Sequence, residues 1–292
     1  MPQIHALLVG INSYPVAPLT GCINDVKAME AYLKKTYDGH RSAIVRIKLL
    51  TDEEPVKPTR ANIIKSFSFF DEAKSGDVCL FYYSGHGSFT KAPEAFWTER
   101  DGYLESFVCM DSRLPGGRDL VNKEMGFLIA KALEGKDNVQ FLAITDCCHS
   151  GTITKALTEN KRTERSYPAD FTPKKLENYL GYGETVNKQL FYKEETIAGK
   201  QRVTAQQSAH IHLAASQDNQ TAKELRIDGK QHGAFTYSLL KTLYGNQGKI
   251  SYAKLLASAR VQVHNLVQSQ DPVLNLNAVS YTHLTLPTKR IV

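Results

Sequence analysis

Short apolar runs alternate along this chain with stretches in which apolar residues recur every three or four positions. The first pattern predicts buried β-strands, and the second predicts amphipathic helices. The predicted strands are Ile4–Ile11, Ala43–Leu50, Val78–Tyr83, Phe107–Met110, Val139–Thr145 and Ile211–Ala215. Helices are predicted from the caps Asn24 and Asp25 to about Lys35, onward from the cap Thr59, over Lys123–Leu133 and Ala234–Tyr244, and from the cap Ser251 to about Val267. Since nearly continuous apolar strands alternate with helices, we expect an α/β fold with a mostly parallel sheet covered on both faces.

One long stretch, residues 152–209, breaks this alternation. It is polar, rich in Lys, Glu, Thr and Tyr, and contains Pro168 and Pro173. Loops of this length are uncommon inside a compact domain. We therefore expect either a functional, partly ordered insertion or a cleavable linker within a single domain of residues 1–277.

The last residues, 279–292, have a foreign character. Val279–Thr288 resembles an in-frame translation of a transposase-type sequencing adapter. We expect the natural sequence to continue differently after about Ala278, and the tail is left out of the fold prediction.

Composition narrows the class of protein. With 292 residues, 42% of them hydrophobic and 23% charged, the chain can bury a large core. No stretch approaches the roughly 20 apolar residues of a membrane span, and the first residues lack a signal-peptide pattern. The five cysteines have neither a disulfide framework nor zinc-site spacing, so a reducing, cytoplasmic location is predicted. The net charge of +6 is scattered, which disfavours a nucleic-acid partner.

Two predicted strands end in residues that can carry out chemistry. One is followed by Ser-Gly-His-Gly at 84–87, and the other by Asp-Cys-Cys-His-Ser-Gly at 146–151. Ligands of parallel sheets bind beyond the carboxyl ends of the strands, so His86 and Cys148 meet there if the two strands are neighbours. A cysteine nucleophile needs a base to form its thiolate near neutral pH, and His86 can take that proton and pass it to a leaving amine. The backbone N–H groups of Gly87 and Cys148 are candidate oxyanion donors.

Purely structural roles for the same residues stay open at this point. A cysteine beside an apolar strand is often a buried hydrophobic residue, and a histidine in a glycine turn is often structural. Strand geometry alone does not choose between Cys147 and Cys148. It sets His149 aside as a base, because successive residues of a strand point to opposite faces.

The two motifs together resemble those of the caspase-like cysteine peptidases, specifically the bacterial metacaspase type (orthocaspases). The likeness covers about residues 4–277. Besides the two motifs, it includes the segments 6–12, 21–25, 215–222, 233–236 and 270–272. It implies a three-layer αβα sandwich with a mostly parallel six-stranded sheet. Residues 1–151 would then match a large-subunit-like part and 210–277 a small-subunit-like part. The family pattern Asp-x-Cys-His-Ser-Gly implies that Cys148 is the nucleophile, and the family also implies a monomer with protein or peptide substrates.

The resemblance also implies where the residue before the cleaved bond (P1) binds. It places Cys22, Asp25, Ser84 and Asp146 around this S1 pocket. Two carboxylates there favour a P1 Arg or Lys. Asp25 has a second interpretation as a helix cap, and Asp146 as an ordinary turn residue at a strand end.

Many metacaspases need calcium, and part of the pattern is present. Asp101 and Glu105 resemble calcium ligands, but Asn122 and Lys123 stand where an acidic pair is expected. A lysine is hard to reconcile with a calcium site, so no cofactor is expected. The alternative interpretation is that Asp101 and Glu105 lie in an ordinary solvated acidic loop.

Basic residues in the insertion complete the picture. Lys155, Lys161, Arg162 and Arg165 are candidates for self-cleavage, or else ordinary surface charges. The sequence therefore predicts a cysteine endopeptidase that cuts after Arg or Lys. The alternatives are a catalytically idle regulatory or scaffold module, and a related peptidase with another P1 preference such as Asn.

Overall fold

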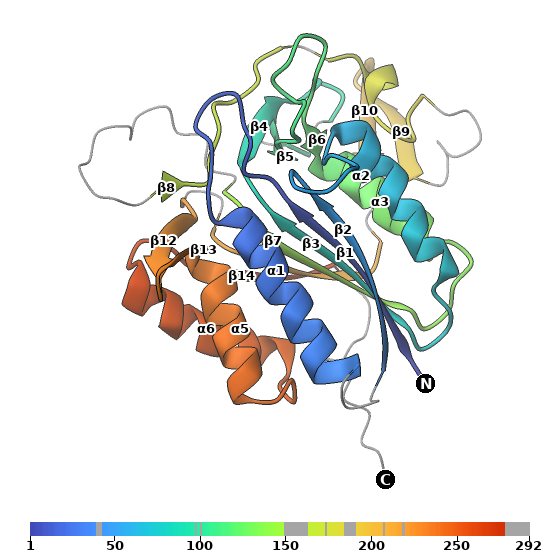
Figure 1. The fold of residues 1–292 in the computed structure, drawn as a ribbon. Helices are drawn as coiled ribbons and strands as arrows, with labels where there is room; N and C mark the ends of the chain where they lie inside the picture. The colour runs from blue at the N-terminus through green and yellow to red at the C-terminus, as the bar shows by residue number, and fades with distance from the viewer. Residues whose placement is uncertain are drawn as a thin grey trace.

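A six-stranded sheet forms the centre of the molecule (Figure 1). The structure, a computed structural model, describes residues 1–38, 43–96, 98–99, 101–148, 163–172, 174–183, 191–206, 208–217 and 220–277. The strand order is β14-β11-β7-β3-β1-β2. The bounds are β1 Gln3–Gly10, β2 Ile44–Thr51, β3 Val78–Ser84, β7 Gln140–Asp146, β11 His210–Ala214 and β14 Val273–Asn277. All pairs are parallel except β11 with β14, which confirms the predicted mostly parallel sheet.

Helices cover both faces of this sheet, so the fold has three layers (Figure 1). One layer contains α1 Cys22–Leu33, α5 Ala234–Gly245 and α6 Tyr252–Leu266, and the other contains α2 Arg60–Ser66, the 3-10 turn η2 Phe67–Glu72 and α3 Asn122–Leu133. Alternation along the strands explains the two cores. Leu8 packs with Met29 of α1, whereas its neighbour Leu7 packs in the cluster that contains Phe70 and Met125.

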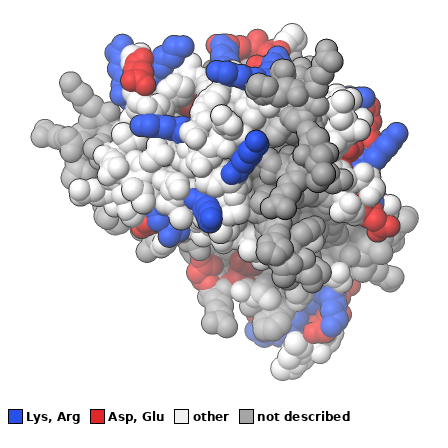
Figure 2. All heavy atoms as spheres, turned by 90° about the horizontal axis from the view of Figure 1, so that it is seen from below, with Lys and Arg blue, Asp and Glu red and all other residues white. Residues whose placement is uncertain are grey.

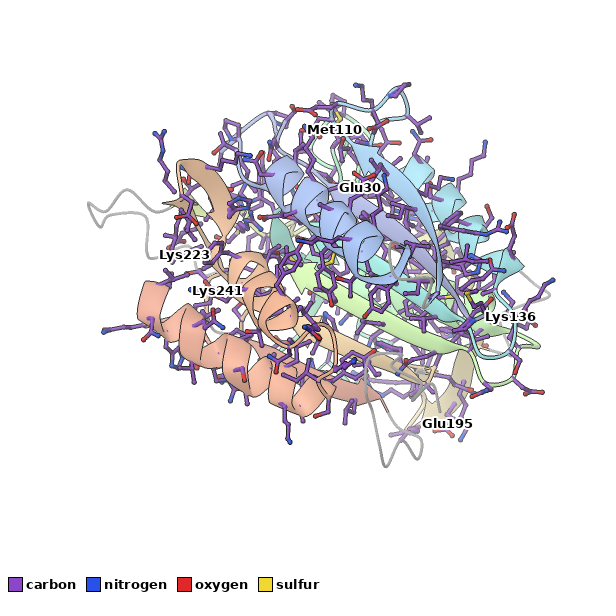
Figure 3. All side chains as sticks on the ribbon, turned by 60° about the horizontal axis from the view of Figure 1, so that its bottom comes forward. Glu30, Met110, Lys136, Glu195, Lys223 and Lys241 are labelled. Atoms are coloured by element: carbon purple, nitrogen blue, oxygen red, sulfur yellow. The ribbon has the colours of Figure 1, made fainter. Side chains whose placement is uncertain are left out.

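Smaller elements gather around the main sheet. One small sheet contains β4 Gly87–Lys91, β5 Tyr103–Phe107 and β6 Leu120–Val121, and another contains β8 Thr163–Glu164, β12 Lys223–Ile227 and β13 Lys230–Gly233. β9 Tyr192–Ile197 and β10 Lys200–Ala205 form a hairpin, and short turns occur at η1 Lys34–Asp38 and η3 Leu176–Asn178. β4 begins three residues after β3 ends, so the first small sheet starts at the carboxyl end of the main sheet. Figure 3 shows Lys223 of β12 and Lys136 at opposite ends of the molecule.

Two local predictions were wrong. The run Phe107–Met110 is not a strand of the main sheet, because β5 ends at Phe107 and the next residues form a buried turn in which Val108 N–H donates to His86 C=O (3.1 Å). Asn24 and Asp25 do not cap the first helix, which begins at Cys22 after Gly21. The caps Thr59 and Ser251 are confirmed, since each hydroxyl accepts from the backbone N–H three residues later.

The insertion contributes to the core where the structure describes it. The buried aromatic residues Tyr167, Tyr179, Tyr182 and Phe191 belong to the cluster that covers the α3 face of the sheet. Irregular spacing hid these residues from a search for periodic patterns. The tail 279–292 lies outside the described part of the chain.

The distribution of charge on the surface and the character of the helices concern possible nucleic-acid and membrane partners. On the face in Figure 2, basic and acidic side chains are scattered among uncharged ones. In the described part of the chain, no helix is both long enough and apolar enough to cross a membrane.

The aromatic cluster at the α2 side of the sheet gives a test of the fold. Phe141 of β7 is 1% exposed, and its ring lies 5.2 Å from the ring of Phe70 and 6.5 Å from that of Phe67. We expect Phe141→Ala to lower the free energy of unfolding by about 3–5 kcal/mol, because the cavity cannot fully collapse. The control Phe171→Ala removes a half-exposed ring and should change it by less than about 1 kcal/mol. Chemical denaturation measures both, and equal effects would contradict this packing.

Candidate active site

The two chemistry-bearing turns lie side by side. β3 and β7 are adjacent and parallel, with Ser84 opposite Asp146. His86 and Cys148 each follow two residues later, so both lie at the same edge of the sheet. Both side chains are fully buried. The sheet order therefore brings the predicted base and the predicted nucleophile together.

The hydrogen bonds of His86 define which ring nitrogen is free. Its Nε2 lies 2.7 Å from the carbonyl oxygen of Ala17, so Nε2 carries the proton and donates it. Nδ1 has no hydrogen-bond partner in the described part of the chain. Burial lowers the pKa of His86 to about 4, against the opposing effect of the nearby backbone of Ala17 and Arg165. A neutral imidazole with a free acceptor at Nδ1 can take up a proton.

The Cys148 thiol is held by the backbone of one residue, Ala222, which lies just before β12. Ala222 N–H donates to Sγ (2.7 Å), and Sγ lies 3.3 Å from Ala222 C=O. Burial raises the pKa of Cys148 to about 12, so the thiol is neutral in this state. No hydrogen bond joins it to His86 among the described contacts. Cys147 lies in the apolar cluster on the other side of the sheet, so the two neighbouring cysteines occupy different environments.

A backbone carbonyl of the insertion lies at the turns that carry His86 and Cys148. The carbonyl oxygen of Arg165 accepts from Gly87 N–H (3.0 Å) and Cys148 N–H (3.2 Å), the two donors predicted for an oxyanion. Arg165 N–H donates to Ala222 C=O (3.0 Å), and β8 pairs with β12 just before it. Only glycine fits at position 87, since a Cβ there would lie 1.8 Å from Cys148 C=O.

The Arg165 side chain fills a buried acidic pocket. Its Nη2 lies 2.7 Å from Asp25 Oδ2 and 3.5 Å from Glu224 Oε2, and its Nη1 lies 3.1 Å from Asp146 Oδ1. Nη1 also donates to Ser84 Oγ (2.9 Å). All four charged side chains are at most 1% exposed. One guanidinium is therefore shared by three carboxyl groups that water does not reach, and burial together with the charge of Asp25 raises the pKa of Asp146.

Backbone and side-chain donors orient two of these carboxylates. Asp25 accepts from Gly233 N–H, and its Oδ1 lies 2.9 Å from His232 Nδ1. Asp146 accepts from the N–H (2.9 Å) and the hydroxyl (2.6 Å) of Thr236 in the first turn of α5. A helix N-terminus favours a nearby negative charge. The pocket is thus built by residues from four distant parts of the chain.

The predicted S1 residues compare with this pocket as follows. Asp25, Ser84 and Asp146 contact Arg165 directly, and Cys22 is buried close enough for the Arg165 charge to oppose the rise that burial causes in its pKa. Sequence reasoning missed Glu224, which lies in a short charged strand without a motif. Glu224 also accepts from Thr20 N–H (3.0 Å) and so fixes the loop before α1.

Other predicted residues lie elsewhere. His149, Lys155, Lys161 and Arg162 are outside the residues that the structure describes. Asp101 accepts from Tyr103 N–H (3.0 Å) at a turn. No group of three or more His, Cys, Asp or Glu side chains could hold a metal ion among the residues searched.

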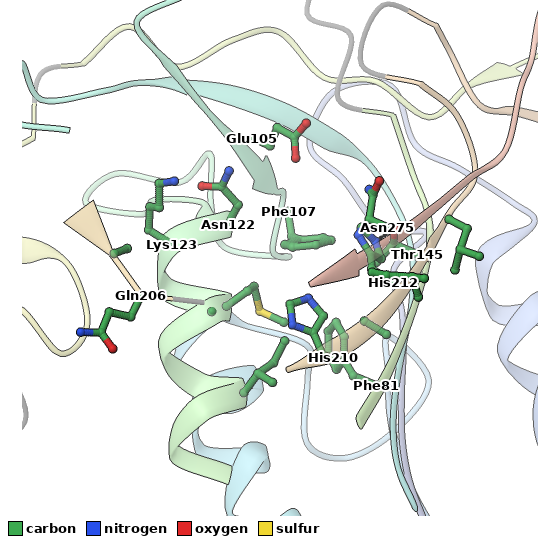
Figure 4. A pocket seen from close by; sticks show the side chains of 17 residues that line it. Phe81, Glu105, Phe107, Asn122, Lys123, Thr145, Gln206, His210, His212 and Asn275 are labelled. Atoms are coloured by element: carbon green, nitrogen blue, oxygen red, sulfur yellow. Dashed lines mark hydrogen bonds between the residues drawn. The ribbon is translucent and has the colours of Figure 1, made fainter. Parts of the chain in front are cut away.

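A separate pocket contains Glu105 (Figure 4). Its volume is about 400 Å³, and Asn122, Lys123 and Phe107 are among its lining residues. Lys123 pairs with Glu99 nearby. The lining includes none of His86, Cys148 and Arg165, so this pocket lies apart from the strand-end site.

Removing the Arg165 charge tests the pocket. In a Cys148→Ala background, Arg165→Ala should lower the free energy of unfolding by about 3 kcal/mol or more, since three buried carboxylates lose their cation. Arg226→Ala on β12 removes an exposed arginine and should have little effect. Urea denaturation compares the two, and a loss below about 1 kcal/mol for Arg165→Ala would count against the buried cluster.

The lowered pKa of His86 predicts how stability depends on pH. Between its folded value near 4 and the usual value near 6.5, the unfolded chain binds the extra proton. Stability should therefore be complete above about pH 6.5 and fall by up to about 3 kcal/mol as pH drops toward 4. Denaturation of Cys148→Ala at about pH 5 and pH 7.5 should show this fall. The double variant with His86→Asn should show a smaller one, and an unchanged difference would contradict the assignment.

Comparison with known proteins gives matches along the whole chain. The sequence model of the family described as Caspase domain matches residues 3–282. Metacaspase-1A of Aspergillus oryzae is 31% identical over an alignment of 275 positions, which covers 87% of this chain and 63% of that protein. Metacaspase-1 of Coccidioides immitis is 31% identical over an alignment of 299 positions, which covers 96% of this chain and 62% of that protein. The chain thus spans somewhat less than two thirds of the length of these relatives.

Solved structures share the fold. Protein GSU0716 from Geobacter sulfurreducens has a TM-score of 0.64 at 21% identity, covering 96% of this chain and 95% of that one. Caspase-1 from Spodoptera frugiperda has a TM-score of 0.54 at 11% identity, covering 100% and 92%. Fungal, bacterial and insect proteins occur among these matches, so the bacterial assignment stays a prediction. The family model, together with the three-layer fold, shows that this chain belongs to the caspase domain family, with metacaspases among its relatives.

Proposed function

We propose that this chain is a cysteine endopeptidase that cuts peptide bonds after Arg or Lys, with Cys148 as nucleophile and His86 as base. One observation carries the proposal: Arg165 lies in the site as a substrate residue would. Its side chain meets three carboxylates, and its carbonyl oxygen accepts from two backbone N–H groups beside the thiol. The first contact would select a basic P1 residue, and the second is the one that acyl transfer to a thiol requires.

The proposed chemistry follows from the free nitrogen of His86. Nδ1 takes the proton of the Cys148 thiol while Sγ bonds to the carbonyl carbon of the P1 residue. The N–H groups of Gly87 and Cys148 stabilise the negative oxygen that forms. The peptide C–N bond then breaks, and the imidazolium gives its proton to the leaving amine. Water, deprotonated by Nδ1, releases the acyl group from sulfur and restores the thiol.

The pocket supports a preference for arginine over lysine. The two terminal nitrogens of Arg165 reach different partners, Asp25 and Glu224 at Nη2 and Asp146 at Nη1. A lysine ammonium is a single point charge and cannot span them in the same way. A P1 aspartate would bring a fourth negative charge into the pocket.

The same contacts favour self-processing at the bond between Arg165 and Ser166. Of the four basic candidates, Arg165 is the one within the described residues, and its carbonyl faces the thiol turn. A cut there would separate residues 1–165 from residues 166–292. While Arg165 fills the pocket, another P1 residue cannot enter, so the intact chain would be inactive toward other substrates.

Peptide cleavage and mass analysis test this function. We expect wild type to yield a fragment beginning at Ser166 and to cut fluorogenic peptides ending in Arg. kcat/KM for P1 Arg should exceed that for P1 Asp by about 1000-fold or more, because the pocket leaves its carboxylates unpaired with Asp. Cys148→Ala should abolish both activities, whereas the control Cys147→Ala should retain them.

Three outcomes would count against parts of the proposal. Activity that survives Cys148→Ala would overturn the nucleophile, and a preference for Asp would overturn the pocket. A thiol inert to iodoacetamide, with no cleavage of any peptide, would favour the idle regulatory module.

A further inference from the structure

The chain continues past Arg165 along the edge of β4. Isolated parallel bridges join Gly87 with Ser166 and Thr90 with Asp170. Tyr167 N–H donates to Gly87 C=O (2.9 Å), and Asp170 N–H donates to Phe89 C=O (2.8 Å). The other edge of β4 pairs with β5. Residues 166–170 therefore lie on β4 as an added strand, a mode in which backbone bonds supply affinity and side-chain slots supply specificity.

One side chain of this added strand enters a slot. The ring of Tyr167 is 6% exposed and lies 5.2 Å from the His86 ring and 6.0 Å from the Tyr14 ring. The Arg113 guanidinium lies over it, 5.3 Å from the ring centre. Aromatic and cation–π contacts of this kind favour a ring over an aliphatic or small side chain. The hydroxyl of Tyr167 has no hydrogen-bond partner among the described residues, so the slot holds the ring rather than the hydroxyl.

Arg113 is held in place by the body of the protein. Its Nη2 lies 3.0 Å from Asp119 Oδ2, and the buried Asp119 also accepts from Ser106 Oγ (2.8 Å). The same Nη2 donates to Ser88 Oγ (3.1 Å) and to Pro168 C=O (3.0 Å). Since Asp119 and Ser88 are not part of the added strand, Arg113 keeps its anchors when residues 166–170 leave.

We infer that β4, Tyr14, His86 and Arg113 form a groove that binds the part of a substrate after the cleaved bond. This groove selects an aromatic residue at the second position after that bond (P2′). The inference rests on the proposed function, since Arg165 must be P1 for Tyr167 to be P2′. A cut after Arg165 lets residues 166–170 leave, and the groove becomes open to the next substrate. The preferred substrate class is then a peptide with Arg at P1 and Tyr or Phe at P2′.

Internally quenched peptides test the slot from the substrate side. The series Thr-Glu-Arg-Ser-Xaa-Pro-Ala-Asp, with Tyr, Phe or Ala at Xaa, is compared on the self-processed enzyme. We expect kcat/KM for Tyr and Phe to exceed that for Ala by about 10-fold, with Phe at least equal to Tyr. A control peptide with the same composition but with Ser and Tyr exchanged moves the ring to the first position and should lose the gain.

The enzyme side is tested with Arg113→Ala. The ratio of kcat/KM for the Tyr peptide to that for the Ala peptide should fall to about 3-fold or less, because the cation over the ring is gone. Arg46→Ala, which removes an exposed arginine of β2, is the matched control and should keep the full ratio. Taking the ratio within each preparation cancels differences in active enzyme. An unchanged ratio in Arg113→Ala would overturn its place in the slot.

A fluorogenic peptide with P1 Arg and no residue after the cleaved bond separates the two proposals. If it is not cut, the proposed function fails, and the groove fails with it. If it is cut while the Tyr, Phe and Ala peptides have equal kcat/KM, the aromatic slot alone is overturned. Cleavage of that peptide together with the 10-fold preference supports both.

Discussion

The structure depends on one buried ion cluster, the Arg165 guanidinium among Asp25, Asp146 and Glu224. Taking four charges out of water costs several kcal/mol per ion, and mutual attraction offsets this only with good geometry and further hydrogen bonds. Those bonds are present, since Ser84, Thr236 and backbone N–H groups also contact these side chains. The cluster joins α1, β7, β12 and the insertion, so it ties together segments that are far apart in the sequence.

The same occupancy explains the electrostatic state of the predicted dyad. With the insertion seated, water is excluded, and burial raises the pKa of Cys148 while it lowers that of His86. Both groups are then neutral near pH 7, which suits a resting state. Departure of the segment would admit water and reduce both shifts, because desolvation is their main cause. Occupancy of the pocket and the pKa values of Cys148 and His86 are therefore linked through one physical variable, the access of water.

Backbone pairing extends the site in both directions from the thiol. On one side β8 lies along β12, and on the other residues 166–170 lie along β4. A peptide that follows this path is held in extended form by backbone pairing with the edges of β12 and β4, whatever its side chains are. In the proposed function, specificity comes from side-chain pockets, the acidic one that holds Arg165 and the aromatic one that holds Tyr167. The aromatic slot has anchors outside the insertion, because Arg113 contacts Asp119 and Ser88. The acidic pocket differs, since its three carboxylates lose their cation when Arg165 leaves.

Much of this fold could be predicted from local patterns. Apolar runs located five of the six main strands within a residue or two, and the turns at Thr59 and Ser251 were recognisable as caps because their hydroxyls act on neighbouring backbone. The last strand, β14, was missed. Asp25 had two interpretations, a helix cap and an S1 residue, and local sequence could not choose between them because its partner Arg165 lies 140 residues away.

The sequence by itself determined which residues are apolar enough to form the layers and which two strand ends carry a thiol and an imidazole. Only the tertiary structure decided that β3 and β7 are neighbours, that Glu224 joins the pocket, and that Arg165 and Tyr167 of an apparently polar loop are buried. The physical reason is that periodicity records which face of an element is buried, but not which element covers it. Strand order and the pairing of buried charges are long-range contacts, and their energies depend on the whole arrangement rather than on any local stretch of residues.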